Sequence, residues 1–290
     1  MSFIYKLDFE IFPPFSQILE SSSLDSFDLL MRSDIGELVS FEEGREVRRI
    51  SIDCGNITER FYVKRNWDDF PSDWIFKKLA RGKLLHNMAY NELIAIRLLE
   101  SQNFPVMKPV AWGERRILGF PCEGFLLVKE VVGKDASEYW QSGDTQLRRR
   151  IMQDAGTMMA RLHQAGIFDW VRLKDIICAS NPQDDTNSPL NFVLIDRTCS
   201  RDRLESFSAD RCYNCLAQSY GFLLKLTPAP TRREILEFTR SYLREFKDGR
   251  LNSLQELMFK TNRRLHQLSL QPGPFQGITL IDCSDWSLDQ

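Results

Sequence analysis

Apolar and polar residues alternate in three short runs between residues 35 and 65 of the chain. A β-strand with one buried face produces such an alternation. Turn-forming residues separate the runs, first at Glu43-Gly44 and then at Cys54-Gly55-Asn56. The pattern predicts an antiparallel meander with strands over residues 37–40, 47–52 and 60–64.

The spacing of apolar residues becomes helical after the meander. Leu93, Ile96 and Leu99 recur at helical intervals and predict an amphipathic helix. Two apolar runs follow and predict strands, and Gly133 marks a break that we interpret as a hinge between two lobes. These expected elements are a helix over residues 88–100 and strands over 110–113 and 125–132.

The rest of the chain is dominated by helical periodicity. A long periodic segment ends at Gly166, a residue that favours the end of a helix. Thr231 precedes Glu234 with the spacing of a capping box, which predicts the start of another helix. We expect helices over residues 24–31, 146–165, 210–226, 231–247 and 251–268, and a short buried strand over 191–195.

Strands that come first and helices that come later predict an α+β protein of two lobes. The N-lobe would hold an antiparallel sheet and the C-lobe would be mainly helical. We expect three parts: residues 1–34 as an N-terminal extension packed on the N-lobe, residues 35–132 as the N-lobe, and residues 133–290 as the C-lobe.

Composition narrows the function classes. The chain has 290 residues, of which 43% are hydrophobic and 27% are charged, and its formal net charge is -2. The protein as a whole therefore has no excess positive charge that would favour binding to nucleic acid. No stretch approaches the roughly 20 apolar residues of a membrane helix, and acidic residues interrupt the N-terminal segment where a signal peptide is apolar. We expect a cytoplasmic protein with reduced thiols. The pair Cys212 and Cys215 lacks further ligands at a zinc spacing.

Three charged residues follow one another in an order typical of ATP-binding sites. Lys64 ends an apolar strand, Glu92 lies on the next helix, and Asp196 ends a later strand. In phosphoryl transfer a lysine contacts the phosphates, a glutamate holds that lysine, and an aspartate binds magnesium. The pattern predicts a binding site for ATP and Mg²⁺ of the kind found in kinases.

With these residues the chain resembles the lipopolysaccharide kinase family, the Kdo-kinase and heptose-kinase group related to protein kinases. The resemblance covers roughly residues 35–245 and implies a protein-kinase-like fold that phosphorylates a sugar of the lipid A inner core with ATP and magnesium. Its matching segments are Arg45-x-Val47, 61–65, 89–92, 109–113, 125–130, 162–167 and 194–196.

The sequence departs from the family pattern at two places. The loop expected over the phosphates, residues 40–45, contains only Gly44 instead of a glycine-rich motif. The catalytic loop of the family carries His-x-Asp, but an ungapped alignment places Asp169 at the histidine, Val171 at the aspartate and Ile176 at the metal residue. Valine cannot accept a proton. Either Asp169 or Asp175 replaces the missing base, or the chain is a pseudokinase.

The expected site residues follow from the trio and the resemblance. We expect Lys64, Glu92, Glu130 and Gly44 to bind the nucleotide, Asp196 and Asp175 to bind metal, and Asp169 and Asp175 to act in catalysis. Arg197 would pair with a phosphate or form a surface ion pair. His163 would anchor the end of its helix rather than act in chemistry.

The expected substrate is a sugar or glycolipid, with no nucleic acid and at most peripheral contact with the inner membrane. A nucleotide-binding pseudokinase that regulates a partner is the main alternative. A small-molecule kinase of the aminoglycoside or choline type is a weaker one, because those enzymes normally keep the His-x-Asp loop.

Overall fold

The computed structural model describes residues 5–67, 86–117, 119–182, 188–197, 203–246, 249–251 and 253–278. Its contacts divide the chain into two compact units. Unit 1 contains Met1–Val131 together with Asp196–Asp202, and unit 2 contains Val132–Ile195 and Arg203–Gln290. The segment that begins at Asp196 therefore belongs with the N-terminal part of the chain, although it is separated from it in sequence.

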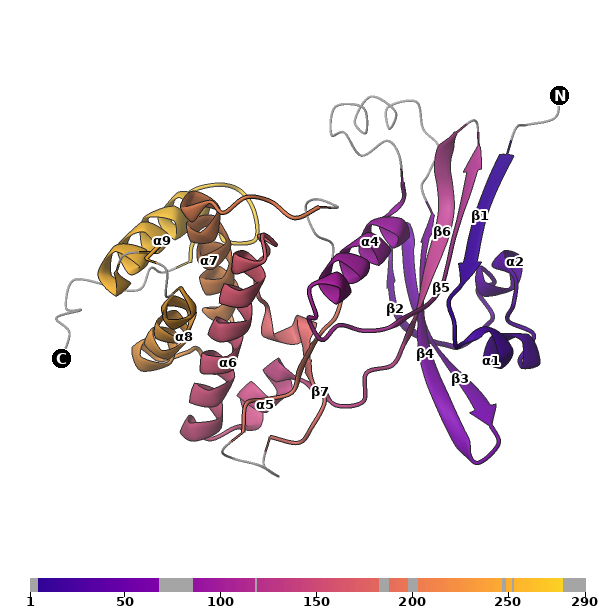
Figure 1. Cartoon of the computed structure of the whole chain (residues 1–290), viewed down its shortest axis with the longest axis horizontal. Helices are drawn as coiled ribbons and strands as arrows, with labels where there is room; N and C mark the ends of the chain where they lie inside the picture. The colour runs from indigo at the N-terminus through magenta and orange to yellow at the C-terminus, as the bar shows by residue number, and fades with distance from the viewer. Residues whose placement is uncertain are drawn as a thin grey trace. The chain divides into compact units, whose positions relative to one another are not determined.

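Unit 1 is built on an antiparallel sheet of six strands in the order β1-β5-β6-β4-β3-β2 (Figure 1). The meander expected from the alternating pattern is present as β2, β3 and β4. The N-terminal strand β1, which the pattern did not predict, pairs with β5 at one edge. The strands are β1 Tyr5–Ile11, β2 Glu37–Glu42, β3 Arg45–Cys54, β4 Ile57–Trp67, β5 Pro109–Ile117 and β6 Phe120–Lys129.

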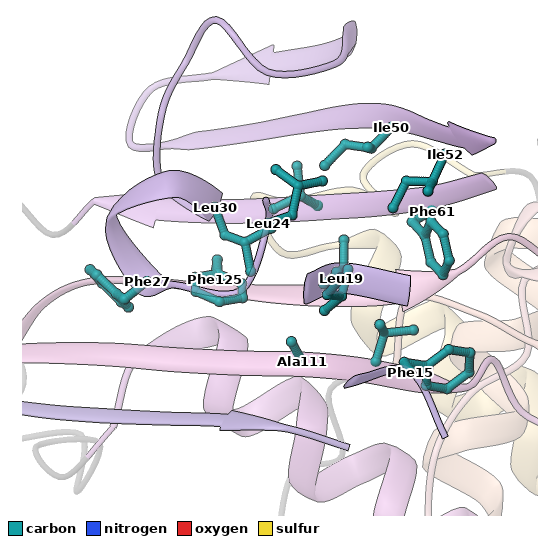
Figure 2. Close-up of a cluster of buried hydrophobic side chains, with 13 residues drawn as sticks. Phe15, Leu19, Leu24, Phe27, Leu30, Ile50, Ile52, Phe61, Ala111 and Phe125 are labelled. Carbon is teal, nitrogen blue, oxygen red and sulfur yellow. The ribbon is translucent and has the colours of Figure 1, made fainter. Parts of the chain in front are cut away.

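The two faces of the sheet are covered differently because successive side chains of a strand point to opposite faces. Phe61 and Val63 of β4 face a buried cluster to which the short helices α1 (Ser16–Ser21) and α2 (Phe27–Leu30) contribute (Figure 2). Lys64 points to the other face, where its amine reaches Glu92 of helix α4 (Met88–Ser101). Residues 12–34 thus supply part of the core of unit 1.

Unit 2 is mainly helical (Figure 1). Its small antiparallel sheet joins β7 Lys134–Asp135, β8 Ile176–Cys178 and β9 Phe192–Leu194. The helices are α5 Ala136–Ser142, α6 Thr145–Gln164, α7 Ala209–Leu223, α8 Arg232–Glu245 and α9 Leu254–Ser269, with a 3₁₀ turn at Leu173–Asp175. No described helix is long and apolar enough to cross a membrane.

Local sequence signals explain where two of these helices start and end. Helix α8 begins with the expected capping box, in which Thr231 and Glu234 bond reciprocally. Helix α6 ends at Gln164, and Gly166 follows the C-cap Ala165 with a φ of +79°. The amide of Gly166 donates to His163 O and that of Ile167 to Leu162 O, the two bonds of a Schellman motif.

Other boundaries differ from the sequence-based expectations. The strand expected over 125–132 is β6, which starts earlier at Phe120 and ends at Lys129. The helix expected over 24–31 is the single turn α2, which begins after its cap Ser26. Residues 68–84, to which the pattern assigned no element, lie outside the described residues.

Candidate nucleotide-binding site

Three charged side chains meet within unit 1. Lys64 Nζ lies 2.5 Å from Glu92 Oε1 and also donates to Asp196 Oδ1. The Lys64 and Glu92 side chains are each 6% exposed, whereas that of Asp196 is 47% exposed. The structure therefore brings together the three residues that the sequence analysis selected. The carboxylates of Glu92 and Asp196 both contact the buried amine of Lys64.

Each partner reaches the lysine for a local reason. Glu92 lies on the buried side of α4, a helix capped by Asn87, whose side chain accepts from Tyr90 N. Asp196 follows β9 by two residues and has a φ of +52°. Positive φ is uncommon for residues other than glycine, although aspartate tolerates it better than most, and such backbone positions cluster at functional sites.

Electrostatics keep the lysine charged. Burial alone would lower the pKa of Lys64, but the charges of Glu92 and Asp196 together outweigh it and raise that pKa. Burial raises the pKa of Glu92, which the charge of Lys64 opposes and that of Asp196 reinforces. Two carboxylates thus share one ammonium, so the cluster can accept further positive charge at the more exposed carboxylate, Asp196.

A magnesium ion fits this arrangement. Mg²⁺ keeps several waters and is usually bound through one or two carboxylates plus substrate phosphates, rather than by a cage of protein ligands. Among the described residues there is no group of three or more His, Cys, Asp or Glu side chains that could hold a metal. The half-exposed carboxylate of Asp196 would hold the ion.

Gly44 and Glu130, the two other residues of unit 1 that we expected to bind the nucleotide, do not contact Lys64. Gly44 has a φ of +75°, and a Cβ there would lie 2.9 Å from Trp67 O, so the β2–β3 turn requires glycine for its own geometry. The Glu130 carboxylate accepts from Tyr62 Oη at 3.1 Å and lies 3.6 Å from Arg60 Nη1. Glu130 is thus engaged by side chains of β4 and not by Lys64.

The loop between α6 and β8 belongs to unit 2 and holds the other two aspartates. Asp169 is 8% exposed, and its Oδ1 accepts from Trp170 N at 2.9 Å. Asp175 is 4% exposed, and its Oδ2 accepts from Arg172 Nε at 2.5 Å. Val171, which lies between them, is fully buried and its amide donates to Ser219 Oγ. The ungapped position of the missing aspartate therefore faces the protein interior.

His163 holds this loop against the end of α6, as the sequence led us to expect. Its Nε2 lies 3.0 Å from the carbonyl oxygen of Asp169, and its Nδ1 lies 2.7 Å from Tyr242 Oη. A carbonyl can only accept, so Nε2 carries the proton and Nδ1 accepts from the tyrosine. Burial lowers the pKa of His163 to about 4. The imidazole is therefore neutral at physiological pH and acts as a structural link.

Two cysteines of helix α7 and two residues of the N-terminal sheet bear on the remaining expectations. Burial raises the pKa of Cys212 to about 11 and that of Cys215 to about 12, so both thiols are protonated at neutral pH. Sequence reasoning did not single out Tyr62 and Arg45, which lie on the same face of the sheet as Lys64. Counting alternate residues from Lys64 along β4, and across the register to β3, would have found both, because they share its face of the sheet.

Comparisons with known proteins agree with this geometry. The model of the "Lipopolysaccharide kinase (Kdo/WaaP) family" matches residues 32–242. Among solved structures, WaaP in complex with acyl carrier protein superposes with a TM-score of 0.58 at 21% identity, covering 90% of this chain and 99% of that chain. No curated protein sequence matches.

Two further solved structures match more distantly. Rad53 in complex with AMP-PNP gives a TM-score of 0.43 at 15% identity, covering 87% of this chain and 63% of that chain. The PknI kinase domain of Mycobacterium tuberculosis gives 0.38 at 11% identity, covering 80% and 94%.

The WaaP superposition and the sheet-then-helix architecture confirm the predicted α+β, protein-kinase-like class. The family model spans well over half of the chain, and it confirms the resemblance seen in the sequence. It supports a lipopolysaccharide core kinase and lends nothing to the pseudokinase alternative. The chain belongs to the lipopolysaccharide kinase (Kdo/WaaP) family.

Proposed function

We propose that the chain transfers the terminal phosphate of ATP to a hydroxyl of a sugar in the lipopolysaccharide core. The observation that carries the proposal is the buried pair of Lys64 and Glu92 with Asp196 on the same amine. The Lys64 amine can contact the phosphates of ATP and stay protonated, because Glu92 compensates its charge both with and without bound nucleotide.

Each residue of the cluster has a distinct role. Lys64 binds phosphate oxygens of the nucleotide, Glu92 fixes the direction of the lysine, and Asp196 holds magnesium. Bound magnesium neutralises charge that develops on the phosphates. Positioning and charge neutralisation supply most of the catalysis in phosphoryl transfer, and these three side chains provide both from unit 1.

The acceptor hydroxyl also needs a base or a hydrogen-bond acceptor. We assign this role first to Asp169 and second to Asp175, which is also the second candidate metal ligand. Both lie on the loop that follows α6, and the slot between them holds the buried Val171. Asp175 forms an ion pair with Arg172, and we propose proton acceptance for Asp169 and a structural or metal-binding role for Asp175.

ATP turnover with inner-core lipopolysaccharide as acceptor tests the proposal. The wild type should consume ATP and label the acceptor, Asp196→Ala should lose both the turnover and the magnesium-dependent part of ATP binding, and Asp169→Asn should lose turnover alone. ATP binding by the wild type without any turnover would favour the pseudokinase alternative. Asp34→Asn, a change at an exposed carboxylate paired with Arg32, serves as the control.

The proposed partners are a glycolipid acceptor and a protein. The acceptor requires at most peripheral membrane contact from a protein in the cytoplasm. The related WaaP structure contains acyl carrier protein, so we propose the same protein as a candidate partner. Co-expression with and without tagged acyl carrier protein tests this, and a complex that survives size-exclusion chromatography would support it.

A further inference from the structure

Arg45 occupies the nucleotide face of the sheet, next to Lys64. The β3–β4 register pairs Val47 with Lys64 and Arg45 with Asn66. Arg45 and Lys64 are therefore diagonal neighbours on one face, which corresponds to roughly 7–8 Å between such positions. Electrostatics agree with this placement: burial raises the pKa of Glu92, and the charges of Lys64 and Arg45 both oppose that rise.

The Arg45 guanidinium has no hydrogen bond or ion pair among the described residues. The other described arginines between residues 5 and 131 all have acidic partners. These pairs are Arg32–Asp34, Arg48–Glu46, Arg49–Glu37, Arg60–Glu130, Arg65–Glu46, Arg97–Glu10, Arg115–Glu123 and Arg116–Glu114. Arg45 is half-buried and still keeps its donors available.

The hairpin that carries Arg45 is poor in glycine. Backbone amides cradle phosphates when glycines let the chain approach closely, but the β2–β3 turn contains only Gly44. The Gly44 carbonyl accepts from Trp67 N at 2.9 Å, which ties the turn to β4. A planar guanidinium just after this turn can supply the phosphate donors that the turn lacks.

We propose that Arg45 is a phosphate-binding residue of the nucleotide site, contacting the β- and γ-phosphates of ATP beside Lys64. This rests on the proposed kinase function. Arg45 then performs with its side chain what a glycine-rich loop performs with its backbone, and it discriminates nucleotides by their number of phosphates.

Calorimetric titration of the full chain with Mg-ATP, Mg-ADP and AMP tests this. Arg45→Met keeps the length of the side chain and removes the charge. A charge-assisted hydrogen bond corresponds to about a 10- to 100-fold change in affinity. We expect Arg45→Met to weaken Mg-ATP binding by about that factor and to leave AMP binding unchanged. Arg45→Lys should restore part of the loss.

The matched control is Arg49→Met, on the same strand and face, because Arg49 is already paired with Glu37. Its ratio of AMP to ATP affinity should equal that of the wild type. Equal ATP affinity in wild type and Arg45→Met, or an equal loss for ATP and AMP, would overturn the assignment of Arg45 and leave the kinase proposal intact. A wild type that binds neither nucleotide would overturn both.

Discussion

At the scale of single residues, the site depends on an imbalance of charge. Lys64 faces two carboxylates, one buried with it and one half-exposed. Attraction to both keeps the amine protonated, but the two carboxylates repel each other through it. The arrangement is therefore stable only while the ammonium is present, which makes the lysine more important for folding than either acid.

We predict that Lys64→Met lowers the free energy of unfolding by about 3 kcal/mol, because Glu92 is left buried without its partner. Glu92→Gln should cost less, since Asp196 still compensates the lysine. The double variant Lys64→Met/Glu92→Leu should recover most of the loss. Urea unfolding measures all three. A Glu92→Gln variant that is less stable than Lys64→Met would contradict this reading of the cluster.

The neutral His163 predicts an acid-sensitive fold. Its pKa is about 4 in the folded protein against 6.5 in the unfolded chain, so the unfolded chain binds the proton first as the pH falls. Stability from this residue is fully present above pH 6.5 and decreases as the pH falls towards 4, by about 3 kcal/mol. Unfolding followed from pH 7 to 4 should show this slope.

The variant His163→Gln removes the titrating group but keeps a side chain that can bond. It should be less stable at pH 7 and should lose this part of the pH dependence. If both proteins show the same slope between pH 6.5 and 4, other groups account for the acid sensitivity and the imidazole is not the origin.

At the scale of elements, the end of α6 fixes where the loop with Asp169 begins. Gly166 combines a left-handed backbone with close packing, since a Cβ there would lie 2.3 Å from Glu205 O. We predict that Gly166→Ala costs more than about 1 kcal/mol and lowers ATP turnover. Gly249→Ala is the control, because Gly249 also has a positive φ but no atom near its Cβ position.

The sequence analysis predicted the strands of the β2–β4 meander but not strand β1. Alternation identified β3 and β4 because one face of each is buried against apolar residues. Strand β1 alternates apolar and charged residues strictly from Tyr5 to Ile11, so the same rule applied to the N-terminal residues would have found it. Helix α5 has only seven residues, too few for a clear helical period.

The sequence could identify only part of the candidate site. Lys64, Glu92 and Asp196 follow the order of a known chemistry, so their types sufficed to select them. The sequence could not decide between Asp169 and Asp175 for the proposed role of the loop aspartate, because they share a residue type and only the backbone geometry fixes their surroundings. Arg45 stands out only once the ion pairs of the other arginines are known.

At the scale of the whole molecule, residues 12–34 are part of the fold of unit 1. Phe15, Leu19, Leu24, Phe27 and Leu30 are buried against the sheet (Figure 2), and the fully buried Arg65 donates to the carbonyl of Leu30. We predict that deletion of residues 1–34 leaves the chain insoluble or unable to bind ATP, because a large apolar face becomes exposed.

The deletion is measured by soluble yield and by binding of a hydrophobic dye. Deletion of residues 279–290, which lie beyond the described part of the chain, provides a shorter contrast at the other terminus. A soluble, ATP-binding protein without residues 1–34 would show that the sheet needs no cover on that face.

The discontinuity of unit 1 has a consequence for synthesis on the ribosome. The amine of Lys64 and the carboxylate of Glu92 emerge early, whereas Asp196 follows Val131 by roughly 65 residues, a delay of several seconds at ordinary rates of translation. The nascent N-terminal unit thus spends this interval with its lysine compensated by one acid only. A fragment that ends after Val131 would lack the proposed metal ligand, so nucleotide-dependent protection from protease should first appear in nascent chains longer than 202 residues.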